Sequence, residues 1–515
     1  MRDTGELPAG WVWTSLGELL TSIETGKSFK CDERPPSVDE VGVIKVSAVT
    51  WGEYREQESK TCTDPDRVNP SLFVRPGDFL FSRANTIELV GACVIARQVG
   101  LSSMLSDKIL RFCFALDSMK PWVLHFLRSK AGRQQIESLA SGNQESMRNI
   151  GQERIGQIRL PLPPTTEQTR IVAKLDELLS GLDAGVAELK AAQQKLQRYR
   201  QSLLKAAVEG ALTADWRRQH PPTETGADLL ARILRERRSR WEHQQLAHYT
   251  AQQKPPPKGW QDKYPEPQAP KTTDLPELPD GWVWASVEQL GVVQLGRQRS
   301  PDKLRGVSPI RYIRAANITE RGIDLSDVLE MDFSESEIET FSLIPGDVLL
   351  TEASGSPEHV GRPAIWTEGS GVYCFQNTVL RFRSSWLGPR FAYVSFLAMQ
   401  KLGLFQKVAG GIGINHLSAG KFSSMPFALP PLSEQVQIAD LLEETMVSAD
   451  SQDQAINRAL KQSAAQRQNL LRAAFRGELV PQDPADEPAS LLLARLRAER
   501  AAAPTRGTRK HRSTA

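Results

Sequence analysis

The longest regular pattern in the chain is a seven-residue spacing of apolar side chains. The spacing is held by Leu175, Leu182, Leu189, Leu196 and Leu203. Apolar residues at this period form one stripe along a helix, and a second helix must cover that stripe. Two prolines and a capping threonine in "LPPTTEQ", residues 162–168, mark where the helix begins. The pattern therefore predicts a long coiled-coil helix that needs a partner.

A weaker copy of the stripe follows "LPPLSEQ", residues 429–435. Its apolar positions include Leu442, Ile456 and Leu470, and polar residues such as Gln452 interrupt it. We predict that the two helices, each about 45 residues and about 65 Å long, pack against each other within the chain. The alternative is two separate helices, each packed on its own globular part.

Short apolar runs dominate the segment that precedes each helix. "GVIKVSAVTW", residues 42–51, and "PIRYIRAANIT", residues 309–319, are rich in β-branched residues and are bounded by turn-forming residues. In "RPGDFLFS" and "IPGDVLLT" the Pro-Gly pair predicts a turn before a buried strand, which gives Gly77 and Gly346 a structural role. Each segment is expected to be a mainly β or α+β domain of about 150 residues.

The same motifs occur twice in the same order, about 270 residues apart. They are LPxGWxW, PGD, LPPxxEQ and LLxAAxxGxL. The predicted fold class is therefore α+β, with two mixed α/β domains alternating with two long helices that pair within the chain as a coiled coil. The predicted parts are a first domain (1–165), a first helix (166–212), a basic helix with a proline-rich linker (213–277), a second domain (278–432), a second helix (433–480) and a C-terminal tail (481–515).

The connecting region differs in composition from the rest. Residues 252–279 are dense in proline, lysine and glutamine, which predicts a semi-extended linker. Basic runs lie at residues 232–240 and 506–512. They are expected to be a solvated helix face and a loose tail, with non-specific phosphate contact as the alternative.

Composition narrows the class of protein. The length of 515 residues, of which 40% are hydrophobic and 24% charged, predicts several folded domains. The net charge is only +3, so any contact with nucleic acid would use local basic patches. The five cysteines form no metal-ligand or disulfide pattern, which favours a reducing compartment. The sequence shows neither a signal peptide nor an apolar stretch of about 18 residues. We expect a cytoplasmic protein without membrane contact.

Catalytic motifs are incomplete wherever they begin. "TGKS" lacks the first glycine of a phosphate-binding loop, because Thr21 stands there. "GGIGINH" ends in His416 rather than the glycine of a dinucleotide motif, and "EASGS" around Ser354 lacks the leading glycine of a nucleophile elbow. We therefore predict no catalytic residue and no metal site.

With their order and repetition, these motifs resemble the specificity subunit of type I restriction-modification systems over nearly the whole chain. The resemblance implies that each globular domain is a target-recognition domain that reads one half of a split DNA sequence. It implies helices at Thr166–Gly210 and Glu434–Gly477 that form an antiparallel coiled coil, fix the distance between the halves and dock the methyltransferase subunits. The linker with its basic flank, and the tail after Gly477, depart from the family pattern.

The resemblance also implies the partners. They are double-stranded DNA, two methyltransferase (modification) subunits and restriction/translocase subunits, while S-adenosylmethionine, ATP and Mg belong to those subunits. This chain would be a non-catalytic subunit that binds no cofactor. A stand-alone DNA-binding repressor and a coiled-coil scaffold remain the alternatives, and co-purification with a methyltransferase would separate them.

Candidates for base contact are polar residues that follow strand-like runs or lie in glycine-rich turns, because their side chains can bond to base edges. They are Lys45, Ser47, Arg83, Asn85, Asn143, Gln144 and Arg148 in the first domain, and Arg314, Asn317, Ser354, Arg362, Asn415 and His416 in the second. A solvated surface role is the alternative for each. The two domains differ outside the shared motifs, so we expect different half-sites.

The septets "LPAGWVW", residues 7–13, and "LPDGWVW", residues 278–284, stand at the entry to each domain. Paired tryptophans can form a stacking surface for a ligand. Their position instead predicts structural anchors that pin the first segment of each domain to its own core.

Overall fold

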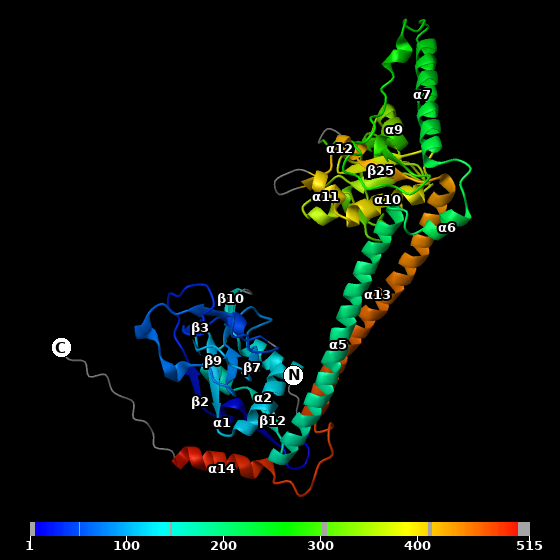
Figure 1. Ribbon diagram of the computed structural model, residues 1–515. Helices are drawn as coiled ribbons and strands as arrows, with labels where there is room; N and C mark the ends of the chain where they lie inside the picture. The colour runs from blue at the N-terminus through cyan, green and yellow to red at the C-terminus, as the bar shows by residue number, and fades with distance from the viewer. Residues whose placement is uncertain (1–5, 51, 145–146, 301–305, 410–414, 503–515) are drawn as a thin grey trace, which may run out of the picture. The chain divides into compact units, whose positions relative to one another are not determined.

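The computed structural model describes residues 6–50, 52–144, 147–300, 306–409 and 415–502. The chain forms two compact units, and each is assembled from both copies of the motif series (Figure 1). Unit 1 is Met1–Leu189 with Asn457–Ala515, and unit 2 is Lys190–Ile456. Each unit therefore contains one globular domain and one half of each long helix.

Two sheets lie at the centre of the globular part of unit 1 and enclose its cores. In sheet order, the first is β2 (Leu20–Thr25), β9 (Ile109–Phe114), β5 (Phe79–Ser82) and β7 (Cys93–Ile95), and the second is β4 (Ser59–Thr61), β3 (Gly42–Ile44) and β8 (Ser103–Met104). Strand β5 is buried on both faces: Phe79 and Phe81 belong to the core that contains helix α2 (Lys120–Arg128), and Leu80 belongs to the core that contains Ile44. The run after the first PGD turn is thus a buried strand, as the sequence predicts.

Unit 2 repeats this arrangement. In sheet order, its first central sheet is β14 (Val292–Leu295), β23 (Val379–Arg383), β19 (Val348–Thr351) and β21 (Pro363–Ile365), and its second is β18 (Leu329–Asp332), β15 (Pro309–Ile313) and β22 (Tyr373–Phe375). Strands β3–β8 and β15–β22 are the parallel pairs in the smaller sheets. Helix α10 (Pro389–Lys401) covers β19 as α2 covers β5. The predicted mixed α/β domains are confirmed.

Short helices complete both globular parts. They are α1 (Leu16–Leu19), α3 (Lys130–Leu139) and α4 (Gln152–Gly156) in unit 1, and α6 (Ala214–Gln219), α8 (Val287–Leu290), α9 (Glu335–Phe341), α11 (Leu404–Val408) and α12 (Ala419–Ser423) in unit 2.

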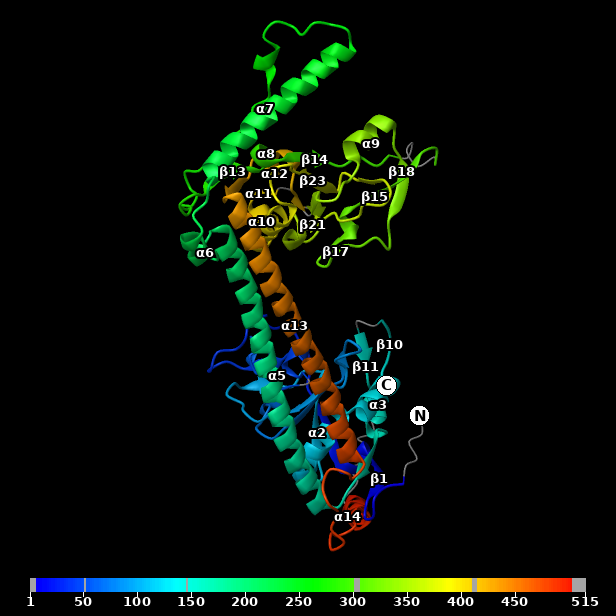
Figure 2. The ribbon, with the colours of Figure 1, turned by 90° about the vertical axis from the view of Figure 1, so that its right-hand side faces the viewer.

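The predicted long helices are α5 (Thr165–Val208) and α13 (Leu432–Phe475), each of 44 residues. In unit 2, Gln193 Nε2 lies 3.3 Å from Asp453 Oδ1 and Arg200 Nη2 lies 2.6 Å from Asp450 Oδ1. Residue numbers on α13 fall as those on α5 rise, so the helices run antiparallel, and Figure 2 shows them side by side. Asp183 and Arg467 form the corresponding pair in unit 1. The predicted antiparallel pairing is confirmed within each unit.

The predicted apolar seam is covered to different degrees. Leu175, Leu196, Leu203 and Leu442 are buried, whereas Leu182, Leu189, Ile456 and Leu470 are half-buried. Leu471, beside the predicted Leu470, is the buried leucine at the end of α13. Leu175 and Leu471 share a core with α2, so the long helices pack on the globular parts as well as on each other.

The repeated motifs meet at one junction in each unit. In unit 1, β1 (Val12–Ser15) pairs with β12 (Arg159–Leu162), and in unit 2, β13 (Val283–Ser286) pairs with β25 (Pro426–Leu429). These pairs bring each septet beside the LPPxxEQ motif of its own copy. Trp11 and Trp282 are buried at this place, as expected for anchors, whereas Trp13 is 38% exposed.

The glycine of LLxAAxxGxL closes the junction from the other copy. Gly477 has φ +70° and lies against Pro8 and Trp11, so a Cβ there would come within 2.6 Å of the Pro8 ring. Gly210 has φ +75° and lies against the septet of unit 2 in the same way. Both the backbone conformation and the close approach require glycine. Each junction therefore combines motifs from both copies.

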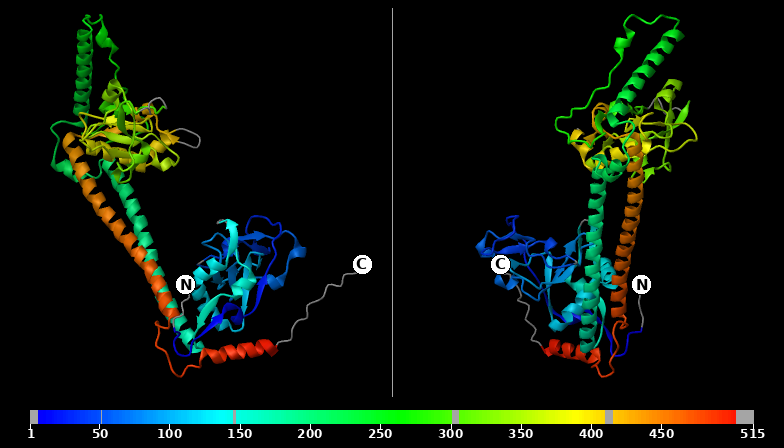
Figure 3. Two further views of the ribbon diagram at one scale, coloured as in Figure 1. Left: turned by 180° about the vertical axis from the view of Figure 1, so that it is seen from behind. Right: turned by 45° about the vertical axis from the view of Figure 1, so that its right-hand side comes forward.

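Helices α7 (Gly226–Ala251) and α14 (Ala489–Ala502) add to the two junctions. The first helical amide of each donates to a septet carbonyl, Gly226 N to Gly281 O at 2.6 Å and Ala489 N to Gly10 O at 2.9 Å. Figure 3 shows α14 beside the start of α5 in unit 1. The segment after residue 480 thus contains a helix, and the basic run 506–512 lies outside the described residues.

Helix α7 uses its basic run for packing within unit 2. The guanidinium groups of Arg237 and Arg240 lie 5.8 and 4.6 Å from the centre of the Trp386 ring. The proline-rich segment folds back on the same helix, because Trp260 is buried and stacks on Trp241 with ring centres 5.8 Å apart. Much of this basic surface is therefore engaged in internal contacts.

Candidate nucleic-acid interface

A small sheet in unit 1 gathers several of the predicted base-contacting residues. Its strands are β10 (Ser141–Gln144), β11 (Met147–Asn149) and β6 (Ala84–Asn85). The register places Arg148 opposite Asn85, and Arg83 immediately precedes β6. Residues more than 50 positions apart in the sequence thus become neighbours. The backbone of Asn143 and Gln144 forms β10, and their side chains lie outside the described part of the chain.

Unit 2 has a sheet at the matching place. Strands β20 (Ala353–Ser354) and β24 (Asn415–His416) pair so that Ser354 faces Asn415 and Ala353 faces His416. The remainder of the glycine-rich turn, residues 410–414, lies outside the described residues. Three predicted residues of the second domain, Ser354, Asn415 and His416, therefore lie together.

The two small sheets share the same backbone anchoring. In unit 1, Ile150 N donates to Arg83 O at 2.9 Å, and Arg83 N donates to Lys108 O at 2.9 Å. In unit 2, Leu417 N donates to Glu352 O at 2.8 Å, and Glu352 N donates to Thr378 O at 2.9 Å. Arg83 and Glu352 therefore occupy corresponding positions.

Side-chain contacts identify two residues that the sequence analysis missed. Arg83 Nε donates to Asn149 Oδ1 at 3.3 Å, and the imidazole Nδ1 of His416 lies 3.2 Å from Glu352 Oε1. Asn149 ends the turn that supplied other candidates, so its amide could have been included. Glu352 was omitted because the selection considered no acidic residue, although a carboxylate can also bond to a base edge.

A second group of predicted residues lies at a pair of matching 3₁₀ helices, Val46–Ala48 in unit 1 and Ala315–Asn317 in unit 2. Exposed Ser47 donates to Glu58 Oε2 at 2.6 Å, and Lys45 Nζ donates to Glu33 O at 3.4 Å. Arg314 forms an ion pair with Asp327. Each side chain is thus held by a neighbour while remaining at least partly exposed.

Two further predicted residues are more constrained. Arg362 is half-buried, and its Nη1 donates to Ile318 O at 3.4 Å. Asn317 is 2% exposed, and its amide donates to Asp324 O at 2.9 Å and Asp327 O at 3.0 Å while accepting from Arg314 N. The prediction that Asn317 lies where it can contact bases is therefore wrong in this structure, because its bonding groups close a loop of the fold.

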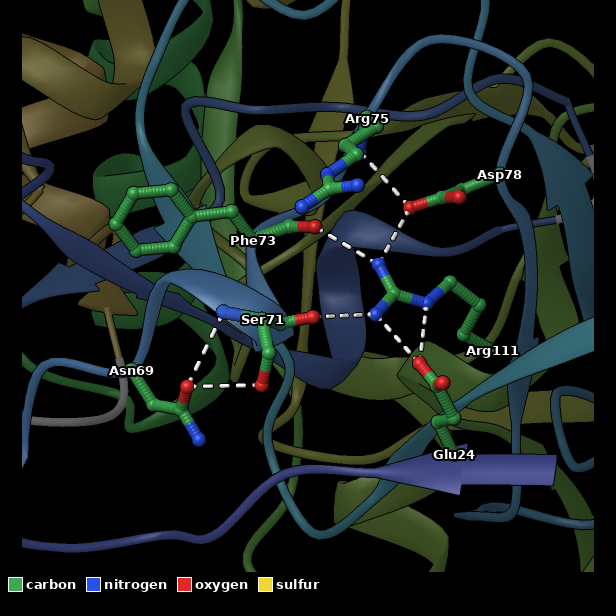
Figure 4. Close-up of polar contacts among 7 residues, drawn as sticks. All are labelled: Glu24, Asn69, Ser71, Phe73, Arg75, Asp78 and Arg111. Atoms are coloured by element: carbon green, nitrogen blue, oxygen red, sulfur yellow. Dashed lines mark hydrogen bonds and ion pairs between the residues drawn. The ribbon is translucent and has the colours of Figure 1, made fainter.

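The PGD motif builds a buried polar centre rather than a binding surface (Figure 4). Asp78 Oδ2 accepts from Arg75 N and from Arg111 Nη1, each at 2.9 Å, and Arg111 also pairs with Glu24. The guanidinium further donates to two backbone carbonyls, those of Ser71 and Phe73. In unit 2, Arg383 pairs with Asp347 at 2.6 Å. Arg111 is 8% exposed, so its role is to hold the fold.

Gly77 and Gly346 of the same motif have φ values of +89° and +95°. A left-handed turn at these positions agrees with the predicted structural role of both glycines. All five cysteines are free. Among the described residues, no group of three or more histidine, cysteine, aspartate or glutamate side chains is placed to hold a metal ion. No described helix combines the length and apolarity needed to cross a membrane.

Comparison with known proteins agrees with this organisation. The family described as "Type I restriction modification DNA specificity domain" matches residues 280–461. The specificity subunit of the type I restriction enzyme StySPI from Salmonella potsdam is 24% identical over 518 residues, which cover 97% of each chain. Over nearly its whole length the chain is thus similar to specificity subunits of type I restriction enzymes.

Other similarities differ in extent. The EcoEI specificity subunit of Escherichia coli is 33% identical over 205 residues, which are 39% of this chain and 34% of that protein. A solved chain from a study of assembly and conformational transition in a type I restriction-modification system aligns with a TM-score of 0.57 at 16% identity. That alignment covers 92% of this chain and 99% of the other chain, and it supports the fold.

Proposed function

We propose that this specificity subunit reads an asymmetric, interrupted DNA sequence, with one half-site read by each globular part. The observation that carries the proposal is the pair of matching small sheets, each of which gathers predicted hydrogen-bonding residues from distant parts of its domain. The sheets share a backbone frame but differ in side chains. Two readers of unlike chemistry recognise unlike half-sites, because base edges are distinguished by their pattern of donors and acceptors.

The long helices set the spacing between the half-sites. Helices α5 and α13 each contribute residues to both units. Their length therefore limits which separations of the two half-sites can be read together. The DNA between the half-sites needs no base contact under this arrangement.

The proposal includes partners and a compartment. The chain binds double-stranded DNA in the cytoplasm and directs two methyltransferase subunits and restriction/translocase subunits to the site. S-adenosylmethionine, ATP and Mg are held by those subunits. The relatives named as specificity subunits of restriction enzymes support this assignment. The net charge of +3 supports a need for partners, because so small an excess of positive charge gives only a weak overall attraction to the DNA phosphates.

Methylation profiling of the host genome tests the proposal. With the chain present, we expect methylation at one interrupted sequence with two different halves. Deletion of the chain should abolish that methylation while the methyltransferase subunits remain. Selective DNA binding without any methyltransferase partner would instead support a stand-alone repressor, and co-purification with proteins but no sequence-dependent methylation would support a scaffold.

A further inference from the structure

The corresponding positions Arg83 and Glu352 carry opposite charges inside the same backbone frame. Each residue accepts a backbone hydrogen bond from the residue that follows β11 or β24, and each donates one to the residue that precedes β9 or β23. The frame therefore cannot account for the difference between the side chains. Different side chains on matching backbone frames are what two readers of unlike half-sites require.

In unit 1 the pair offers hydrogen-bond donors. Arg83 is oriented by its Nε, which donates to Asn149 Oδ1 at 3.3 Å. Within the described residues, its two terminal nitrogens have no other hydrogen-bond partner. A guanidinium held at Nε and free at its other nitrogens can donate to both the O6 and N7 acceptors of guanine.

In unit 2 the pair offers a different pattern. The Glu352 side chain is 15% exposed and the His416 side chain is 51% exposed, so the imidazole is the outer group. Its Nδ1 lies 3.2 and 3.3 Å from the two carboxylate oxygens of Glu352. A carboxylate at Nδ1 favours the tautomer with the proton there, which leaves Nε2 as an acceptor in neutral imidazole. Such an acceptor matches an exocyclic amino group, N6 of adenine or N4 of cytosine.

We propose that Arg83 and His416 are corresponding specificity-determining residues, with Asn149 and Glu352 as the positioning residues that orient them. Unit 1 reads a guanine through Arg83, and unit 2 reads a base with a major-groove amino group through His416. This inference rests on the proposed function. It extends that function by assigning a chemical class of base to one position in each half-site and by giving an acidic residue a place in the reading surface.

Selection from a pool of duplexes with randomised half-sites tests the assignment. The full-length chain, reconstituted with its methyltransferase subunits, is used as wild type and as the variants Arg83→Lys, His416→Ala and Glu352→Gln. Arg83→Lys keeps the charge and removes the fork, so preference for guanine at one position should fall by roughly 5- to 150-fold, with the other half-site unchanged. His416→Ala should relax one position of the opposite half-site only.

Glu352→Gln separates positioning from bulk charge. We expect it to change base preference at the same position as His416→Ala, because the amide can also present a donor to Nδ1 and no longer fixes the tautomer. Exposed Lys130 and Glu368 supply controls, since Lys130→Ala removes a cation elsewhere in unit 1 and Glu368→Gln makes the same charge change as Glu352→Gln elsewhere in unit 2. Both controls should leave the selected sequences unchanged.

The outcomes distinguish this inference from the function on which it rests. If wild-type complex selects two half-sites, and Arg83→Lys and His416→Ala select the same ones, the assignment is overturned while the proposed function stands. Equal weakening on every sequence would also overturn it, because it indicates phosphate contact. If wild-type complex selects no sequence, the proposed function itself fails.

Discussion

The indole Nε1 of Trp11 donates a hydrogen bond of 2.9 Å to Glu167 Oε2, a carboxylate that is 1% exposed. Trp282 and Glu434 form the same bond at 2.9 Å in unit 2. The surroundings differ: Glu434 also accepts from Thr213 Oγ1 at 2.6 Å and pairs with Arg217, whereas Glu167 Oε1 has no hydrogen-bond partner in the described structure. The two junctions therefore share the tryptophan–glutamate hydrogen bond, but among the described residues only the carboxylate of Glu434 has a further hydrogen-bond donor and an ion pair.

Replacement of the donor should reveal this inequality. Trp11→Phe removes the hydrogen bond donated to Glu167 Oε2, so we expect unit 1 to lose about 1–3 kcal/mol of stability. Trp282→Phe should cost less, because Glu434 keeps its bonds to Thr213 and Arg217. Scanning calorimetry measures both losses, and hydrogen exchange locates each in its unit. Equal losses would contradict this explanation.

A single hydroxyl group should improve the weaker junction. Val480 in "AFRGELV" stands where "AVEGALT" has Thr213. We expect Val480→Thr to stabilise unit 1 by up to about 1 kcal/mol, since it places a donor near the unpaired Glu167 oxygen. The reverse change, Thr213→Val, is the matched control and should destabilise unit 2. Denaturant unfolding measures both, and a destabilising Val480→Thr would show that the position is not equivalent.

The same carboxylate predicts a pH dependence. Burial raises the pKa of Glu167 above its ordinary value of 4.5. Because the folded state then binds the proton more tightly than the unfolded state, wild-type stability rises as pH falls through the folded pKa. Glu167→Gln lacks this gain, so its stability relative to wild type should be highest at pH 7.5 and decline towards pH 4.5. A difference that is constant with pH would contradict the raised pKa.

The buried arginine centre should affect folding and leave sequence preference unchanged. Arg111→Met leaves Glu24 and Asp78 without their cation, so we expect a loss of about 3–5 kcal/mol. The methylated sequence should stay the same in whatever complex still folds. In contrast, we expect Arg83→Lys to change the methylated DNA sequence and to leave the stability of the protein nearly unchanged. A new methylation sequence for Arg111→Met would place this centre in the reading surface.

The spacing role of the long helices can be tested by a paired deletion. Removing seven residues from α5 and seven from α13 keeps the apolar stripe in phase, since the stripe repeats every seven residues. We expect methylation profiling to show the same two half-sites separated by a shorter gap. The control deletes seven residues from α5 alone. This deletion should misalign the helix pair and abolish sequence-dependent methylation. An unchanged gap after the paired deletion would exclude the spacing role.

The antiparallel direction of the helix pair came from the resemblance to a known family, whereas the sequence pattern alone predicted the long helices, their pairing and the order of the repeated motifs. These features depend on local periodicity and on short motifs, so they can be read without knowing which distant residues meet. It also identified the glycine turns, because a left-handed backbone restricts the residue type. It could not distinguish Leu470 from Leu471 as the buried residue, since that choice depends on the side from which α2 covers the helix.

The tertiary structure alone decided which polar residues share a surface. Strand register pairs Arg148 with Asn85 and Ala353 with His416, and register depends on the paths of long loops rather than on local pattern. Burial removed Asn317 from the set, and side-chain contacts brought in Glu352 and Asn149. The sequence also could not predict that a glycine from the other copy packs against each septet. This contact forms only because the antiparallel helices return the chain to the domain from which it started.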